Sequence, residues 1–126
     1  MTRRRLKKIV TVYAAFSAFA FATPAWPQDD WSVFFSYNGI DFSYSPGSVQ
    51  HSGDDVTVKW HDSQESQLIY LAQIDCSART IQSLSVYRYD PQTGAFIETV
   101  DLRNSSTVDA IGASGTMAAN LAQATC

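Results

Sequence analysis

Histidine and cysteine are scarce in this sequence, which contains two of each in 126 residues. His51 lies beside a predicted turn and His61 at the end of a predicted strand, while Cys76 and Cys126 have no histidine or further cysteine near them in the chain. A metal site needs several converging ligands, and acid–base catalysis needs a nucleophile with a positioned base. The sequence therefore predicts no metal site, no cofactor and no enzymatic activity. We expect solvated histidines, with a weak divalent-metal or haem contact involving His51, His61 and Asp62 as the alternative.

Positive charge is also scarce once the first 25 residues are set apart. Five of the nine lysine and arginine residues lie before residue 9, whereas all twelve acidic residues lie after residue 25. The remainder carries four basic and twelve acidic side chains, a net charge of −8. Nucleic acids and anionic lipids bind clustered positive charge. This balance therefore argues against both as partners.

Residues 1–25 have the organisation of a signal peptide. Five basic residues precede an uncharged, mostly apolar run of 14 residues from Ile9 to Ala22. A bilayer-spanning helix needs about 20 residues, so this run fits an export signal better than a membrane span. Small residues predict cleavage after Ala25 or after Ala22, and an uncleaved N-terminal anchor is the alternative. We expect a periplasmic or secreted protein without a stable membrane anchor after cleavage, because no cysteine directly follows the apolar run for lipid attachment.

The two cysteines are expected to form a disulfide. Cleavage leaves roughly 100 residues, which is enough for one domain of marginal stability. An even number of cysteines in an exported protein favours a Cys76–Cys126 bond. Such a bond would join residues 50 positions apart, and the chain-entropy model gives it roughly 4 kcal/mol of stabilisation. A metal-binding pair and a reactive thiol are the alternatives.

Alternating apolar and polar residues predict an antiparallel sheet. The expected strands are WSVFFSY (31–37), DFSY (41–44), VTVKWH (56–61), QLIYLAQIDC (67–76), SLSVYRYD (83–90) and AFIETVDL (95–102). Asn38-Gly39 predicts a tight turn, and DPQTG (90–94) predicts a hairpin loop. Segment 67–76 is nearly continuous in apolar character and is expected to be a central strand buried on both faces. In the first strand, alternation places Trp31, Val33, Phe35 and Tyr37 on one face.

The C-terminal segment TMAANLAQA (116–124) changes to helical spacing. Met117, Leu121 and Ala124 recur at the interval of a helix face, and Thr116 is placed to cap its first turn. Residues 103–113 are expected to be an irregular connection. The predicted fold class is α+β: a single small domain over residues 30–126, with an antiparallel sheet of five or six strands. Its C-terminal helix packs on one face and is joined to the sheet by Cys76–Cys126.

Two groups of side chains are candidates for recognition. Asp75 and Arg79 flank Cys76, and we expect an ion pair or a backbone bond that fixes the strand end, with an exposed recognition pair as the alternative. The predicted hairpin 83–100 carries Tyr87, Arg88 and Tyr89, residue types that are enriched at binding hot spots. We predict that these three residues contact a protein partner. In the alternative, the tyrosines pack beneath the helix and Arg88 pairs with a neighbouring carboxylate.

Several short motifs follow one another along residues 30–126. They are Tyr44-Ser45-Pro46-Gly47-Ser48-Val49, Val58-Lys59-Trp60, Ile74-Asp75-Cys76-Ser77-Ala78-Arg79, Tyr89-Asp90 with Gly94, and Leu121 with Cys126. In order and spacing they resemble the surface-adhesin protein E-like family. The chain departs from that pattern at Ser45, where the family usually has aspartate, and at Ser114-Gly115-Thr116, where Pro-Gly-Ser is common.

The resemblance implies a disulfide-linked antiparallel sheet with a helix, and named members of the family are lipid-anchored bacterial surface adhesins that contact host matrix proteins. We therefore expect an exported, non-enzymatic protein-binding module, with adhesion to host or matrix proteins as the implied role. A soluble periplasmic accessory protein that binds bacterial envelope partners is the alternative. It would suit a chain that has no cysteine for a lipid anchor after its apolar run.

Overall fold

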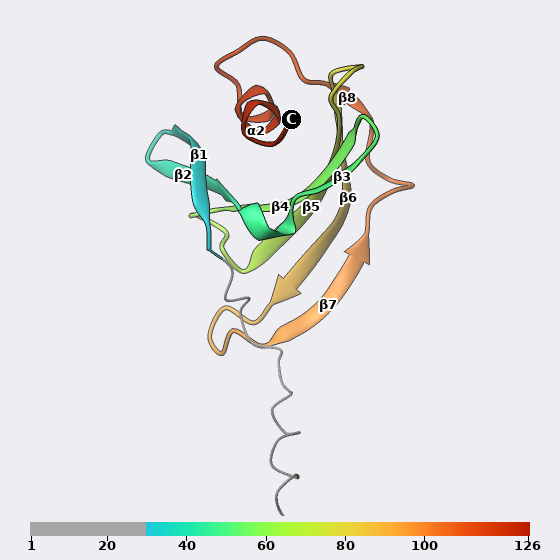
Figure 1. Cartoon of the computed structure of the whole chain (residues 1–126). Coiled ribbons are helices and arrows are strands. Elements are labelled where there is room, and N and C mark those ends of the chain that lie inside the picture. The colour runs from blue at the N-terminus through green and yellow to red at the C-terminus, as the bar shows by residue number, and fades with distance from the viewer. Residues whose placement is uncertain (1–29) are drawn as a thin grey trace, which may run out of the picture.

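The computed structural model describes residues 30–126, so the predicted signal peptide and its cleavage sites lie outside the described residues. Figure 1 shows a strongly curved antiparallel sheet that wraps around one C-terminal helix, α2 (Met117–Thr125). The expected α+β class, single domain and helix on one sheet face are confirmed. No helix in this part of the chain is long and apolar enough to cross a membrane.

The sheet of the described domain contains eight strands. They are β1 (Ser32–Tyr37), β2 (Ile40–Tyr44), β3 (Gln50–Ser52), β4 (Asp55–Asp62), β5 (Leu68–Asp75), β6 (Thr80–Tyr89), β7 (Phe96–Asp101) and β8 (Asp109–Ala110). Six of them lie in the order β1-β2-β4-β5-β6-β7, while the short strands β3 and β8 pair with β4 and β6. The expected sheet of five or six strands corresponds to this main order. The prediction of an irregular connection over 103–113 was wrong at β8, which two residues form against β6.

The turns form where residues with the required backbone freedom occur. Asn38 and Gly39 both have positive φ, 53° and 78°, and join β1 to β2 in a two-residue hairpin. Positive φ at both central positions is typical of the turn that matches the twist of paired strands, and Asn-Gly is the pair that adopts it most readily. Pro46, Gly47 and Ser48 form a short 3-10 helix, η1 (Pro46–Ser48), where a turn was predicted.

Helix α2 begins at the predicted cap. The Thr116 hydroxyl accepts a hydrogen bond from the Ala119 N–H at 3.1 Å, which satisfies one of the amides that a helix start leaves unpaired. Leu121 is fully buried, as expected, together with Ala122. Ala124, in contrast, is exposed. Its assignment to the apolar stripe was wrong, because the sheet contacts the face centred on Leu121.

The core lies between α2 and the inner face of the sheet. Val58 from β4, Ile74 from β5 and Leu121 from α2 are each fully buried there. Ile69, on the opposite face of β5, is also buried, so the prediction of a central strand buried on both faces is confirmed. Ile111 joins the core directly after β8, which explains why this connection is ordered against the sheet.

Strand β1 departs from the predicted alternation. Its register with β2 shifts between Val33 and Phe35, so one extra residue, Phe34, is inserted and the side-chain phase changes. Phe34 packs against the core beside Tyr44, with ring centroids 6.0 Å apart, whereas Val33 and Tyr37 are exposed. The expected face of Trp31, Val33, Phe35 and Tyr37 was therefore wrong.

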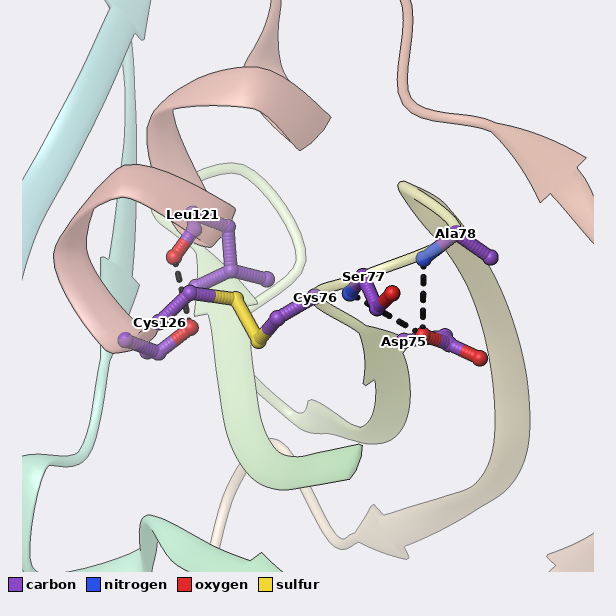
Figure 2. Close-up of a disulfide and its surroundings, with 7 residues drawn as sticks. Asp75, Cys76, Ser77, Ala78, Leu121 and Cys126 are labelled. Atoms are coloured by element: carbon purple, nitrogen blue, oxygen red, sulfur yellow. Dashed lines mark hydrogen bonds between the residues drawn. A yellow bond between two sulfur atoms is a disulfide. The ribbon is translucent and has the colours of Figure 1, made fainter. Parts of the chain in front are cut away.

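The disulfide joins the end of the helix to the sheet. Cys76, immediately after β5, is bonded to Cys126, the cap residue of α2, across a sequence separation of 50 residues. Figure 2 shows the bond reaching from the last helical turn to the turn that follows β5. The predicted pairing is confirmed, and the metal-pair and reactive-thiol alternatives are excluded because neither cysteine is free.

A candidate partner-binding surface on the β6–β7 hairpin

The loop between β6 and β7 is closed by hydrogen bonds of its own residues. Asp90 Oδ1 accepts from the N–H groups of Gln92 at 2.8 Å and Thr93 at 3.3 Å. The Asp90 N–H donates to the Ala95 carbonyl at 2.7 Å, and the Gly94 N–H donates to the Asp90 carbonyl at 2.8 Å. Aspartate at the start of a turn commonly holds the following amides in this way. The predicted hairpin is therefore confirmed, with a loop that its own sequence fixes.

Two of the three predicted contact residues lie on opposite faces of β6. Tyr87 pairs with Ile69 of β5, on the face that points away from α2, and the Lys59 ammonium lies 5.1 Å from the centroid of its ring. Arg88 points to the other face and forms an ion pair with Glu98, its direct neighbour on β7. Both partners are about half exposed, at 43% and 47%. The alternative prediction therefore holds for Arg88, which pairs with a neighbouring carboxylate. It is wrong for Tyr87, which does not lie beneath the helix.

The end of the hairpin exposes a small apolar cluster. The rings of Tyr89 and Phe96 meet edge to face, with centroids 5.6 Å apart. Phe96 is 44% exposed and Ile97 is 49% exposed. The register between the two strands shifts at this point, and Ile97 is the extra residue. We call Tyr89, Phe96 and Ile97 the hairpin cluster.

The sequence reasoning had not singled out Phe96 and Ile97. Their alternation within AFIETVDL identified a strand, and apolar strand residues are most often buried in a sheet. Their exposure follows from the position of β7 at the end of the strand order. That position depends on the strand order of the whole sheet, which cannot be predicted from the alternation of residues within one strand.

A thin layer of long side chains covers the outer face of the sheet. Ile69 is only 1% exposed, although α2 lies on the opposite face. Tyr87 is its direct neighbour on β6, and Lys59 lies over that tyrosine ring. Further along the same face, Trp31 and His61 meet edge to face with ring centroids 4.3 Å apart. Amphipathic side chains of this kind cover apolar surface while they keep their polar ends in water.

The two histidines do not converge. His51 lies in β3 and pairs with Val56 near the start of β4, whereas His61 lies near the end of β4. Val56 and His61 are five positions apart on an extended strand, about 17 Å at the rise of a β-strand. Asp62, the third predicted ligand, uses its carboxylate to accept loop N–H groups. Residues 30–126 contain no group of three or more potential ligands that could hold a metal ion.

Asp75 and Arg79 make backbone bonds beside the disulfide. Asp75 Oδ1 accepts from the N–H groups of Ser77 at 3.1 Å and Ala78 at 2.9 Å, as Figure 2 shows. Arg79 has a φ of 58° and donates its own N–H to the Asp75 carbonyl at 2.8 Å. Its guanidinium donates to the Gly112 carbonyl at 3.3 Å. These bonds match the expected structural role, which is to fix the strand end that carries Cys76.

One hollow of about 490 Å³ lies on the helix side of the sheet, near the start of α2. Its lining includes Trp60 and Met117, and Asp109 is its only ionisable side chain among the described residues. The Asp109 carboxylate accepts a hydrogen bond from the Thr107 hydroxyl at 2.9 Å. The hollow therefore offers an apolar surface with hydroxyl groups, but no pair of acid and base.

Tyr70 is partly buried between an aromatic ring and two carboxylates. Its ring stacks on Trp60 with centroids 4.7 Å apart. Burial, and then the carboxylates of Glu65 and Asp62, raise the pKa of Tyr70 above its ordinary value. All three causes disfavour the phenolate, so Tyr70 stays neutral at physiological pH.

Comparison of the chain with models of protein families, with curated proteins and with solved structures finds no match in any of the three.

Proposed function

We propose that this chain is an exported, non-enzymatic protein-binding module similar to surface-adhesin protein E, and that the β6–β7 hairpin contacts its partner. The observation that carries the proposal is the exposure of Phe96 and Ile97, at 44% and 49%, beside Tyr89. Large apolar side chains that gather on a surface are typical of interaction sites, and tyrosine and phenylalanine are enriched at interfaces.

The rest of the hairpin supports the same role. The loop bonds of Asp90 hold the cluster in place before binding, so little ordering entropy is lost when a partner docks. Arg88 and Glu98 form a half-exposed ion pair next to the cluster. Charged groups around an apolar centre make the polar rim that protein interfaces commonly have. In this proposal Tyr89, Phe96 and Ile97 form the centre of the contact surface and Tyr87 extends it along the outer face. Arg88, which points to the opposite face, contributes at the rim with Glu98.

The non-enzymatic part of the proposal rests on the placement of the possible general bases. His51 lies on β3 beside the start of β4, whereas His61 lies near the other end of β4, so one imidazole does not assist the other. His61 is packed edge to face against Trp31, and Asp62 is occupied by the loop that follows it. Binding through a preformed surface needs none of these groups.

A pull-down experiment with matched variants tests the proposal. Mature protein would be immobilised and exposed separately to bacterial envelope extract and to host-matrix extract. The hairpin variants are Arg88→Ala/Tyr89→Ala and Phe96→Ser/Ile97→Ser. The control is Val33→Ser/Tyr37→Ser, which alters two exposed apolar residues on β1, at the other end of the strand order. Circular dichroism must first show that each variant is folded.

We expect the wild type and the β1 control to recover the same partner and both hairpin variants to lose it. A partner from the host matrix would support adhesion, and a partner from the envelope extract would support the periplasmic accessory role. Protease accessibility on intact cells separates these two roles independently. Equal recovery by hairpin variants and wild type would remove the hairpin from the site, and no protein partner from either extract would refute the proposed function.

A further inference from the structure

Strand β7 is an open edge of the sheet. Within residues 30–126 it pairs with β6 and with no other strand. The Leu102 N–H donates to the Leu84 carbonyl at 2.9 Å. This bond shows which residues of β7 point their backbone groups toward β6. Residues of an antiparallel strand point their N–H and C=O groups alternately toward and away from the neighbour. Val100 therefore directs its backbone groups to β6, while Thr99 and Asp101 direct theirs outward.

Strand β7 has only part of the protection that edge strands commonly carry. Natural edge strands are blocked by proline, by charged side chains and above all lysine, by bulges or by covering elements, and β7 has two acidic side chains and one bulge. β7 reads FIETVD, without proline or lysine, and its residues are exposed apart from the partly buried Val100. The bulge at Ile97 affects only its start, which leaves Glu98 to Asp101 in regular pairing with β6. The opposite edge, β1, has a bulge in its middle and also contacts α2.

The charge around this edge identifies the kind of partner it fits. Glu98 and Asp101 lie on β7, and Asp90 lies in the loop before it. The basic residues nearby are Arg88, which pairs with Glu98, and Arg103, which follows β7. Residues 30–126 carry four basic and eleven acidic side chains, a net charge of −7. A second copy of the chain would bring the same negative charge to the edge, and like charges disfavour association. A segment with lysine or arginine side chains is attracted to it.

We propose that the open edge of β7 binds an extended, basic polypeptide segment, which joins the sheet as an additional antiparallel strand. Backbone bonds to Thr99 and Asp101 supply affinity, and alternate side chains of the segment meet the two faces of the edge. On the outer face they lie beside Thr99 and the hairpin cluster, and on the inner face beside Val100 and the Arg88–Glu98 pair. Strand addition of this type is a recurrent mode of peptide recognition. The inference rests on the proposed function, since it names the partner class for the same hairpin.

The test uses a capped eight-residue peptide of alternating lysine and valine as probe, with a glutamate–valine peptide as its control. The key variant is Thr99→Pro, which removes an outward N–H and keeps the inward bonds to β6. Proline is tolerated at such edge positions. Thr99→Val is the matched control because it keeps the N–H. Hydrogen exchange of wild-type amides, measured by nuclear magnetic resonance, gives a second readout that needs no variant.

We expect the lysine peptide to protect the amides of Thr99 and Asp101 in the wild type and to bind Thr99→Pro at least tenfold more weakly, with Thr99→Val unchanged. Equal binding of the glutamate peptide, protection confined to other strands, or unchanged binding to Thr99→Pro would each overturn the proposal. So would sedimentation that shows a dimer abolished by Thr99→Pro, because a second copy would then occupy the edge.

The same variant separates this inference from the proposed function. A natural partner that Thr99→Pro recovers as well as the wild type would refute strand addition and leave the binding function standing. Edge-dependent binding of the lysine peptide without any protein recovered from either extract would retain the edge site and refute the proposed function.

Discussion

Cys126, the last residue of the chain, is bonded to Cys76 at the end of β5, and this bond closes a segment of 50 residues that contains β6, β7, β8 and α2. The same end of β5 is held by Asp75, which accepts two backbone N–H groups from the following turn. The helix and the strand end are therefore fixed at one point. The β6–β7 hairpin lies within the closed segment, and its first strand pairs along β5, the strand that ends beside Cys76.

Removal of the disulfide should destabilise the domain. The double variant Cys76→Ser/Cys126→Ser is expected to lose roughly 4 kcal/mol of unfolding free energy, because its unfolded chain regains the entropy of a 50-residue loop. Urea unfolding followed by circular dichroism measures the change, with reduced wild-type protein as the comparison. Alkylation of the native protein without reductant should find no free thiol. Labelling of both cysteines under those conditions would contradict the disulfide.

Leu121 should be the most sensitive position on the helix. Its side chain is fully buried against the sheet, and replacement of a buried leucine by alanine usually costs about 2–5 kcal/mol. We expect Leu121→Ala to fall in that range in urea unfolding. Gln123→Ala is the matched control, since Gln123 is exposed on the same helix and surface changes usually stay within about 0.5 kcal/mol. Equal losses in the two variants would show that α2 does not pack as described.

Sequence predicted the features that neighbouring residues determine. Asn38-Gly39 forms its tight turn, Asp90 starts its hairpin loop, and Thr116 caps its helix. Each of these depends on a few adjacent backbone groups. The wrong side-chain face predicted for β1 also has a local cause, a bulge that the apolar–polar alternation does not reveal. Phe34 and Phe35 are both apolar, so WSVFFSY permits either side-chain phase, and the bulge selects the phase that buries Phe34.

The candidate site was only partly predictable. Tyr87, Arg88 and Tyr89 do lie on a hairpin, as their pattern indicated. The exposure of Phe96 and Ile97 results from the place of β7 in the strand order, which depends on how distant segments pair. The core position of Ile111 arises in the same way, because β8 pairs with β6 across a long separation in sequence.

Tyr70 should give the domain a specific sensitivity to alkali. Burial and the nearby carboxylates raise its pKa in the folded protein, whereas the unfolded chain should titrate at about 10. The folded state therefore holds this proton more tightly. The resulting stabilisation is complete below the unfolded pKa and is lost as the pH rises through the folded pKa. We expect the unfolding free energy of the wild type to decline as the pH rises above about 10.

Tyr70→Phe removes the ionisable hydroxyl and keeps the ring that stacks on Trp60. Its unfolding free energy should consequently decline less steeply than that of the wild type over the same alkaline range. Urea unfolding at neutral pH and at several alkaline values, followed by circular dichroism, measures both slopes. Tyr37→Phe controls for the loss of a hydroxyl, because Tyr37 is an exposed tyrosine on β1. Parallel declines in the wild type and Tyr70→Phe would show that ionisation of Tyr70 is not linked to folding.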